Sequence, residues 1–239
     1  MEDGGPSFPP LLSGEATDGD PFALAVARAK EGTDAGLITH RVRPDRLAAA
    51  VVLAPETPLR DALAMVLAAM NGFADAFGAL SPSEVACQFV WPGGIRINGA
   101  RCGSFRAAAS TTNPANEPDW LVIGFEVPFF AEADAEPGDN PEETTLWDEG
   151  CSEIEPLRLL ESWSRHLLVW IHEWEETGMS RLHEDWLGRA FTMGEDTAVT
   201  LGGRSHEGTM LGLDEAGGLL LKTGTGTELV PLTEILEEV

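Results

Sequence analysis

The stretch that decides the fold is Trp91-Pro92-Gly93-Gly94-Ile95-Arg96-Ile97-Asn98-Gly99-Ala100-Arg101-Cys102-Gly103. Asn-Gly is favoured in two-residue β-hairpin turns because both turn positions adopt positive φ. Asn98-Gly99 therefore predicts a hairpin between Arg96-Ile97 and Ala100-Arg101. Apolar segments on both sides of it, at 84–90, 105–109 and 120–127, predict further strands of the same sheet.

Helix patterns surround this hairpin. Asp20-Pro21 supplies an N-cap and a first-turn proline for a helix that Gly32 ends. Apolar residues at spacings of three and four predict a second helix from Thr57 to Phe77 and a third from Pro156 to Gly178. The apolar run at 46–54 is typical of a buried strand. The fold class that follows is α/β (α+β): a mixed β-sheet with helices packed against it.

The two ends of the chain differ from its middle in composition. Residues 1–19 are rich in Pro, Gly and acidic residues, which predicts a flexible N-terminal arm, and 131–144 predicts a mobile loop for the same reason. Residues 195–239 predict four short strands, at about 197–201, 207–213, 218–222 and 227–231, which favour a small C-terminal β-barrel. The main domain then spans 20–190.

Charge and cysteine content narrow the class of protein. Fifteen Lys plus Arg against forty Asp plus Glu give a net charge of −25, which argues against nucleic acid and anionic membranes as partners. There is no apolar run of transmembrane length and no signal sequence at the start. Three cysteines without CxxC spacing predict reduced thiols in a cytoplasmic protein.

The hairpin stretch resembles the active-site hairpin of biotin protein ligases. That family has Trp-Pro-Asn-Asp, a hydrophobic residue, a turn and a lysine; this chain keeps Trp91-Pro92 and Ile95, has Gly93-Gly94 in place of Asn-Asp, and has Arg101 at the lysine position. Residues 120–127 resemble the family's following strand. Independently, 207–221 resembles the family's C-terminal barrel, with Gly208, Gly212 and Asp214 at the matching positions.

The resemblance implies an enzyme that joins a carboxylate to ATP, with Mg, and passes the acyl group of biotin or lipoate to a lysine of a carrier protein. It implies Arg101 as the catalytic cation. It further implies a small acyl ligand as substrate and a homodimer as the assembly. The substrate-binding candidates are Arg41, Arg43, Trp91, Pro92, Gly93, Gly94, Gly103 and Trp120. No metal-binding motif formed by protein side chains is predicted, because His166 and His172 point to different sides of one helix.

Each candidate also has a plainer interpretation. Arg101 lines a ligand pocket, or it is an ordinary strand arginine in a salt bridge. Arg41 and Arg43 hold an anion, or they are solvated charges on a turn that lacks the family's Gly-Arg-Gly-Arg pattern. Trp120 lines an acyl pocket or belongs to the core. The three cysteines are buried packing residues or acyl-transfer nucleophiles.

Two functional hypotheses therefore lead. One is a biotin/lipoate ligase-like protein that binds an acyl ligand or its adenylate, with turnover in doubt because lysine is replaced by Arg101 and the Gly/Arg loop is missing. The alternative is a non-catalytic binding or protein-interaction module on the same scaffold. The chain's two lysines, Lys30 and Lys222, both lie outside the hairpin. A third hypothesis is cysteine-dependent acyl transfer.

Overall fold

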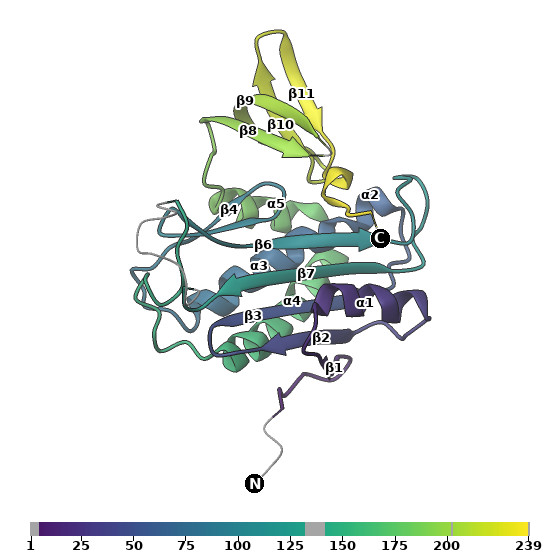
Figure 1. Cartoon of the computed structure of the whole chain (residues 1–239). Coiled ribbons are helices and arrows are strands. Elements are labelled where there is room, and N and C mark those ends of the chain that lie inside the picture. The colour runs from purple at the N-terminus through teal and green to yellow at the C-terminus, as the bar shows by residue number, and fades with distance from the viewer. Residues whose placement is uncertain (1–4, 132–141, 202, 239) are drawn as a thin grey trace.

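A computed structural model describes residues 5–131, 142–201 and 203–238 of the chain. It contains a large sheet with helices on both faces and a smaller C-terminal sheet next to it (Figure 1). The predicted α/β (α+β) class with a mixed sheet is confirmed.

The large sheet has seven strands in the order β1-β2-β3-β7-β6-β5-β4. Their bounds are β1 Ser13–Ala16, β2 Leu37–Val42, β3 Arg46–Leu53, β4 Cys87–Val90, β5 Gly94–Ile97, β6 Ala100–Ala109 and β7 Leu121–Pro128. β1 pairs with β2 in parallel, and every other described pairing in this sheet is antiparallel.

The face away from α1 is covered by helices α2 (Leu59–Ala62), α3 (Ala64–Gly78), α4 (Pro156–Thr177) and α5 (Met179–Gly188). α3 was expected to bury one face, but it is buried almost all round, because α4 and α5 cover the side that the sheet leaves open. Trp163 of α4 donates its indole N–H to the Ala69 carbonyl of α3, at 3.1 Å. Its ring also packs edge-on against Phe125 of the sheet.

The opposite face is covered in part by helix α1 (Pro21–Lys30), which lies in front of the sheet in Figure 1. The predicted cap is present: the Asp20 carboxylate accepts a hydrogen bond from the Phe22 amide at 2.9 Å. Phe22, Ala25, Val26 and Ala29 form a second, smaller core with residues of β3, β6 and β7. α1 therefore packs on this face of the sheet through a narrow stripe of apolar side chains.

The predicted hairpin is confirmed. Asn98 and Gly99 have φ values of 49° and 90°, and they connect β5 to β6. The Trp91-Pro92 peptide bond before β5 is cis. Trp91 is buried, and its indole N–H donates to the Gly217 carbonyl at 2.9 Å. Because Gly217 belongs to the C-terminal unit, this bond joins the hairpin to the small sheet.

The small sheet contains the four predicted strands, β8 (Asp196–Leu201), β9 (Arg204–Leu213), β10 (Leu219–Thr223) and β11 (Gly226–Val230), followed by the short helix η1 (Leu232–Ile235). Their order is β11-β10-β9-β8. Within the described residues β8 and β11 each pair with a single neighbour, so the unit is an antiparallel sheet that stays open at both edges.

Some expectations need correction. The arm at 1–19 is not loose throughout, because Ser13–Ala16 forms β1 on the edge of the large sheet. Thr57 does not cap the second helix; Pro58 precedes α2 without a side-chain cap. Helix α5 was not predicted. Most of the loop predicted at 131–144 lies outside the described residues. None of the helices in the described ranges combines the length and the apolar character that crossing a bilayer requires.

The bond from Trp91 to Gly217 leads to a prediction about stability. Trp91→Phe removes the donor and leaves a buried carbonyl without a partner, so we expect the free energy of unfolding to fall by about 1–3 kcal/mol. Urea unfolding followed by far-UV circular dichroism measures this change. Trp147→Phe is the matched control, since Trp147 is 51% exposed, and should change stability by less than about 0.5 kcal/mol. Equal stabilities for the two variants would show that the Trp91 bond contributes nothing.

Candidate functional site

A cavity of about 170 Å³ lies on the α1 side of the large sheet. Its walls come from the start of α1 and from strands β3, β6 and β7. The lining residues are Asp20, Pro21, Phe22, Ala48, Ala49, Ser104, Arg106, Gly124, Phe125 and Glu126. The small residues on the strands leave this space open, and the charged residues Asp20, Arg106 and Glu126 border it.

The direction of the β6 side chains depends on Gly103. Cys102 and Phe105 are three residues apart, yet both are buried in the main core. One extra residue is therefore inserted between them, as in a β-bulge, and the β5–β6 register shifts at this point. Gly103 has a φ of 131°, and a Cβ there would overlap the Glu126 carbonyl oxygen, so only glycine fits. Beyond the bulge, Ser104 and Arg106 line the cavity on the α1 side.

Gly124 forms part of the cavity floor and lies beside Arg106 in the β6–β7 register. A Cβ on Gly124 would lie 2.8 Å from the Phe22 ring. A larger residue there would push α1 away from the sheet, so the glycine permits the close packing of helix and strand.

Arg106 is the cation among the described residues that line the cavity. Its Nε and one terminal nitrogen donate to both carboxylate oxygens of Glu237, at 2.8 and 2.7 Å, and the other terminal nitrogen donates to Asp20 at 3.0 Å. The guanidinium carbon lies 4.2 Å from the centre of the Phe22 ring. The hydrogen bond to Glu237 is the main cause that raises the pKa of Arg106 above its usual value. The side chain is fully charged and held in one orientation.

Glu126 is the acidic group on the β7 side of the cavity. It forms ion pairs with Arg46 at 2.5 Å and with Arg41 at 3.5 Å. Arg41 also donates to the Gly19 carbonyl at 3.1 Å, just before α1. Arg41, predicted to bind substrate, thus reaches the edge of the cavity region, where a carboxylate of the chain itself already pairs with it.

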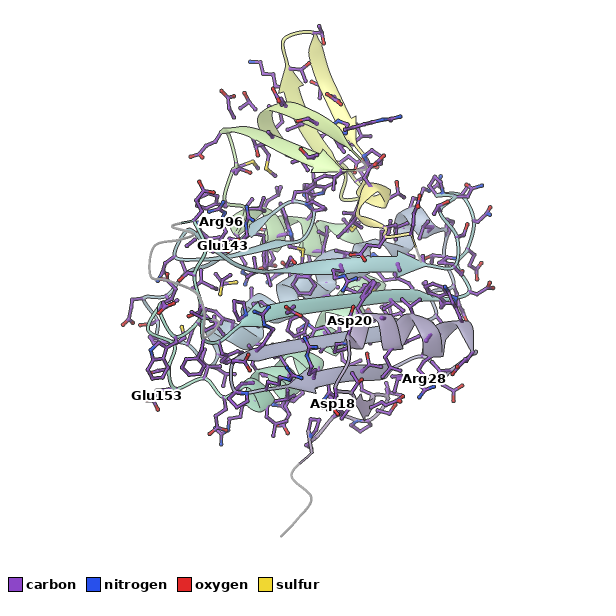
Figure 2. All side chains as sticks on the ribbon, in the orientation of Figure 1. Asp18, Asp20, Arg28, Arg96, Glu143 and Glu153 are labelled. Carbon is purple, nitrogen blue, oxygen red and sulfur yellow. The ribbon has the colours of Figure 1, made fainter. Side chains whose placement is uncertain are left out.

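Arg101, the predicted catalytic cation, does not line the cavity. Its side chain is 60% exposed and its guanidinium lies 3.6 Å from the Glu143 carboxylate. Figure 2 shows Glu143 and Arg96 toward one end of the sheet, away from Asp20 at the start of α1. The geometry matches the plainer of the two interpretations, a strand arginine in a salt bridge, and a catalytic role for Arg101 stays a prediction.

The other predicted substrate-binding residues are spread over several places. Trp91 is in the main core, Pro92 and Gly93 belong to the turn that leads into β5, and Gly94 is the first residue of β5. A Cβ on Gly93 would lie 2.7 Å from the Phe105 carbonyl oxygen. Trp120 packs against the small core beneath α1. None of these residues, nor Gly103, lines the cavity.

Arg43 is exposed on the turn between β2 and β3 and has no ion-pair partner among the described residues. No group of three or more His, Cys, Asp or Glu in the described ranges is arranged to hold a metal ion.

Sequence reasoning missed the residues that line the cavity. Arg106 and Glu126 each interrupt an apolar strand, and that interruption was the available signal. A charge inside an otherwise apolar strand marks a position that faces an opening or a partner charge. Asp20 was recognised as a helix cap, but its second role, as a partner of Arg106, depends on a residue 86 positions away.

Comparison with known proteins matches both parts of the fold. Residues 8–188 match the biotin/lipoate A/B protein ligase family, and 192–235 match the biotin protein ligase C terminal domain. The chain is 23% identical over 189 residues to the biotin–[acetyl-CoA-carboxylase] ligase of Paracoccus denitrificans, covering 79% of this chain and 78% of that protein.

Two solved structures show the same fold. A biotin protein ligase-like protein of unknown function from Silicibacter sp. TM1040 superposes with a TM-score of 0.89 at 49% identity, over 98% of this chain and 100% of that one. The biotin protein ligase of Aquifex aeolicus superposes with a TM-score of 0.73 at 15% identity, over 94% and 96% of the two chains.

Thiol chemistry leads to a testable prediction. Burial raises the pKa of the Cys87 and Cys102 thiols to about 12 and also raises the pKa of the Cys151 thiol. A thiol stays protonated below its pKa, and only the thiolate is nucleophilic. We therefore expect all three cysteines of the folded protein to react with Ellman's reagent at pH 8 at least about tenfold more slowly than in denaturant. Fast labelling of one thiol in the folded protein would restore cysteine-dependent acyl transfer as a hypothesis.

Proposed function

The chain belongs to the biotin/lipoate A/B protein ligase family, and we propose that it binds a small acyl ligand in the cavity beneath the start of α1 while forming an acyl-adenylate weakly or not at all. The observation that carries the proposal is the cavity between α1, β3, β6 and β7, which is floored by small residues and bordered by a fixed guanidinium.

The shape and chemistry of the cavity support binding of a small acyl ligand. Ala48 and Gly124 leave room along the sheet, and the Phe22 ring supplies an apolar wall. Small-molecule sites combine apolar walls, which supply affinity, with polar groups that fix orientation. This cavity has both, and its polar groups are Asp20, Ser104, Arg106 and Glu126. Biotin and lipoate are the acyl groups that the family name points to, and both are candidates for this ligand.

The residues of this chain fit ATP poorly. ATP brings a triphosphate, usually with Mg, and needs unpaired cations or backbone amides close together. Arg101 is paired with Glu143 and Arg41 with Glu126. At Gly93, where the family has asparagine, a Cβ would come within 2.7 Å of a carbonyl oxygen, so a side chain fits only if the backbone moves. The chain's two lysines, Lys30 on α1 and Lys222 on β10, both lie outside the hairpin that carries Arg101.

A second candidate function is a non-catalytic protein-interaction module. One observation favours it: Arg41 and Arg106 are both neutralised by carboxylates of the same chain. The protein partner of either candidate is proposed by analogy with the Paracoccus denitrificans ligase, whose name states acetyl-CoA carboxylase as its target. In the first candidate that partner is a carrier protein, and in the second it is a docking partner.

Ligand binding predicts a thermal shift. At one hundred times its Kd, a ligand stabilises the folded state by about 2.7 kcal/mol, which for a chain of this size raises the Tm by about 5–10 °C. We expect such a rise with a non-hydrolysable biotinyl- or lipoyl-adenylate analogue or with the free acid. Ser104→Leu fills the exposed side of the cavity and should abolish the rise. Ser205→Leu, an exposed strand serine of the small sheet, is the matched control and should keep it. A Tm that no acid or analogue moves would favour the interaction module.

Turnover is tested separately by pyrophosphate exchange into ATP. With biotin, lipoate or octanoate as the acid, we expect a rate at least about 1,000-fold below that of an active biotin protein ligase run alongside. The reason is that Arg101 and Arg41, the cations that the resemblance assigns to the site, are each already paired with a carboxylate of the chain. Exchange at a rate comparable with that enzyme would contradict the proposal that adenylation is lost.

A further inference from the structure

We propose that Arg106 recognises the end of the ligand remote from its acyl carboxylate, and that this end is anionic, as in a dicarboxylic acid. The inference rests on the proposed function, because it needs a ligand in the α1 cavity. It deepens that function by naming the ligand class and the residue that selects it.

Arg106 already shows how the site binds a carboxylate. Glu237 accepts two parallel hydrogen bonds from its guanidinium, and Asp20 accepts a third. A two-point pairing of this kind is specific to planar oxyanions. The Phe22 ring beneath the guanidinium is itself 4% exposed, so the guanidinium lies over a buried ring at the cavity edge. Arg106 thus forms a carboxylate-binding site, and the Asp20 and Glu237 side chains of the same chain occupy it.

Glu237 is the partner that a ligand would replace. It follows η1 near the end of the chain, and its backbone amide donates to the Ala107 carbonyl at 2.9 Å. Its side chain is 40% exposed, so its carboxylate regains hydration when it leaves Arg106, which offsets part of the lost pairing. Asp20, by contrast, also caps α1 and is held in place by the Phe22 amide. A ligand carboxylate would therefore exchange with Glu237 and leave the Asp20 contact intact.

The cavity disfavours an apolar group beside Arg106. Arg106 is 38% exposed, and a purely hydrocarbon tail placed there would displace Glu237 or water without offering an acceptor. Phe22, Ala48 and Gly124 suit a short methylene chain, whereas the end of that chain meets the guanidinium. An acid with an apolar middle and a carboxylate at each end matches both features.

A medium-chain diacid with one end at Arg106 would extend along β6 from the cavity toward the hairpin. Arg106 is the one arginine among the described residues that line the cavity, so selection of an anionic end rests on it. Octanedioate and octanoate form a suitable probe pair, since they have the same chain length and differ by one carboxylate.

The experiment is titration calorimetry of the full chain with the two acids at pH 7 and low ionic strength. We expect octanedioate to bind at least about tenfold more tightly than octanoate, and the preference to shrink with added salt. Arg106→Met should remove the preference, while Arg106→Lys, which keeps the charge but loses the fork, should retain part of it. Arg158→Met, at a 72% exposed arginine on α4, is the matched control and should keep the full preference.

Glu237→Gln separates ligand recognition from a structural role. Removing the competing charge should strengthen octanedioate binding about threefold and leave octanoate binding unchanged. If Arg106 only ties the C-terminal segment to α1, both Arg106→Met and Glu237→Gln would lower the Tm without changing the ratio of the two affinities, and the inference would be overturned.

The measurements distinguish loss of the diacid preference from loss of acyl-ligand binding. Equal affinities of the wild-type chain for the two acids would overturn the diacid preference and leave acyl-ligand binding standing. Absence of binding by both acids, together with no Tm rise from any adenylate analogue, would overturn the proposed function itself.

Discussion

The contact between Gly103 and the Glu126 carbonyl determines which side chains reach the candidate site. Strand side chains alternate between the two faces of a sheet, so one inserted residue exchanges the faces for everything beyond it. The bulge at Gly103 lets both Cys102 and Phe105 face the main core. It also turns Ser104 and Arg106 toward α1. Without it the charged side chain of Arg106 would point into the packed helices, and the cavity would lose its cation.

Charge pairing is the second constraint on the site. In this acidic chain, with a net charge of −25, the arginines at and near the cavity are paired with carboxylates. Arg101 pairs with Glu143, Arg41 and Arg46 with Glu126, and Arg106 with Asp20 and Glu237. These pairs lower the positive potential that a triphosphate would need. In the proposed site a ligand carboxylate would replace Glu237 alone on Arg106, whereas a triphosphate would have to displace several such partners.

Local sequence pattern by itself determined the elements that rest on short-range physics. Asn98-Gly99 specified the hairpin through its positive φ values, and Asp20-Pro21 specified the start of α1. The apolar periodicity of 156–178 specified α4 and its buried stripe. The hairpin and the 207–221 stretch together were enough to indicate the family, since each has a characteristic residue order. In all of these cases the information lies within one turn, one helix or one strand.

Only the tertiary structure decided what the charged residues do. Asp20, Arg106 and Glu237 are far apart in the chain, and they meet because α1, β6 and the segment after η1 converge on one edge of the cavity. Sequence position suggested Arg101 as the functional cation, whereas Arg101 is 60% exposed beside Glu143 and the bulge places Arg106 at the cavity. Helix α5 and strand β1 were missed for the same reason, since long-range packing and pairing with β2 hold them. Short-range propensity specifies an element, but the face on which a charge emerges and the partner that it meets are set by register and packing across the whole fold.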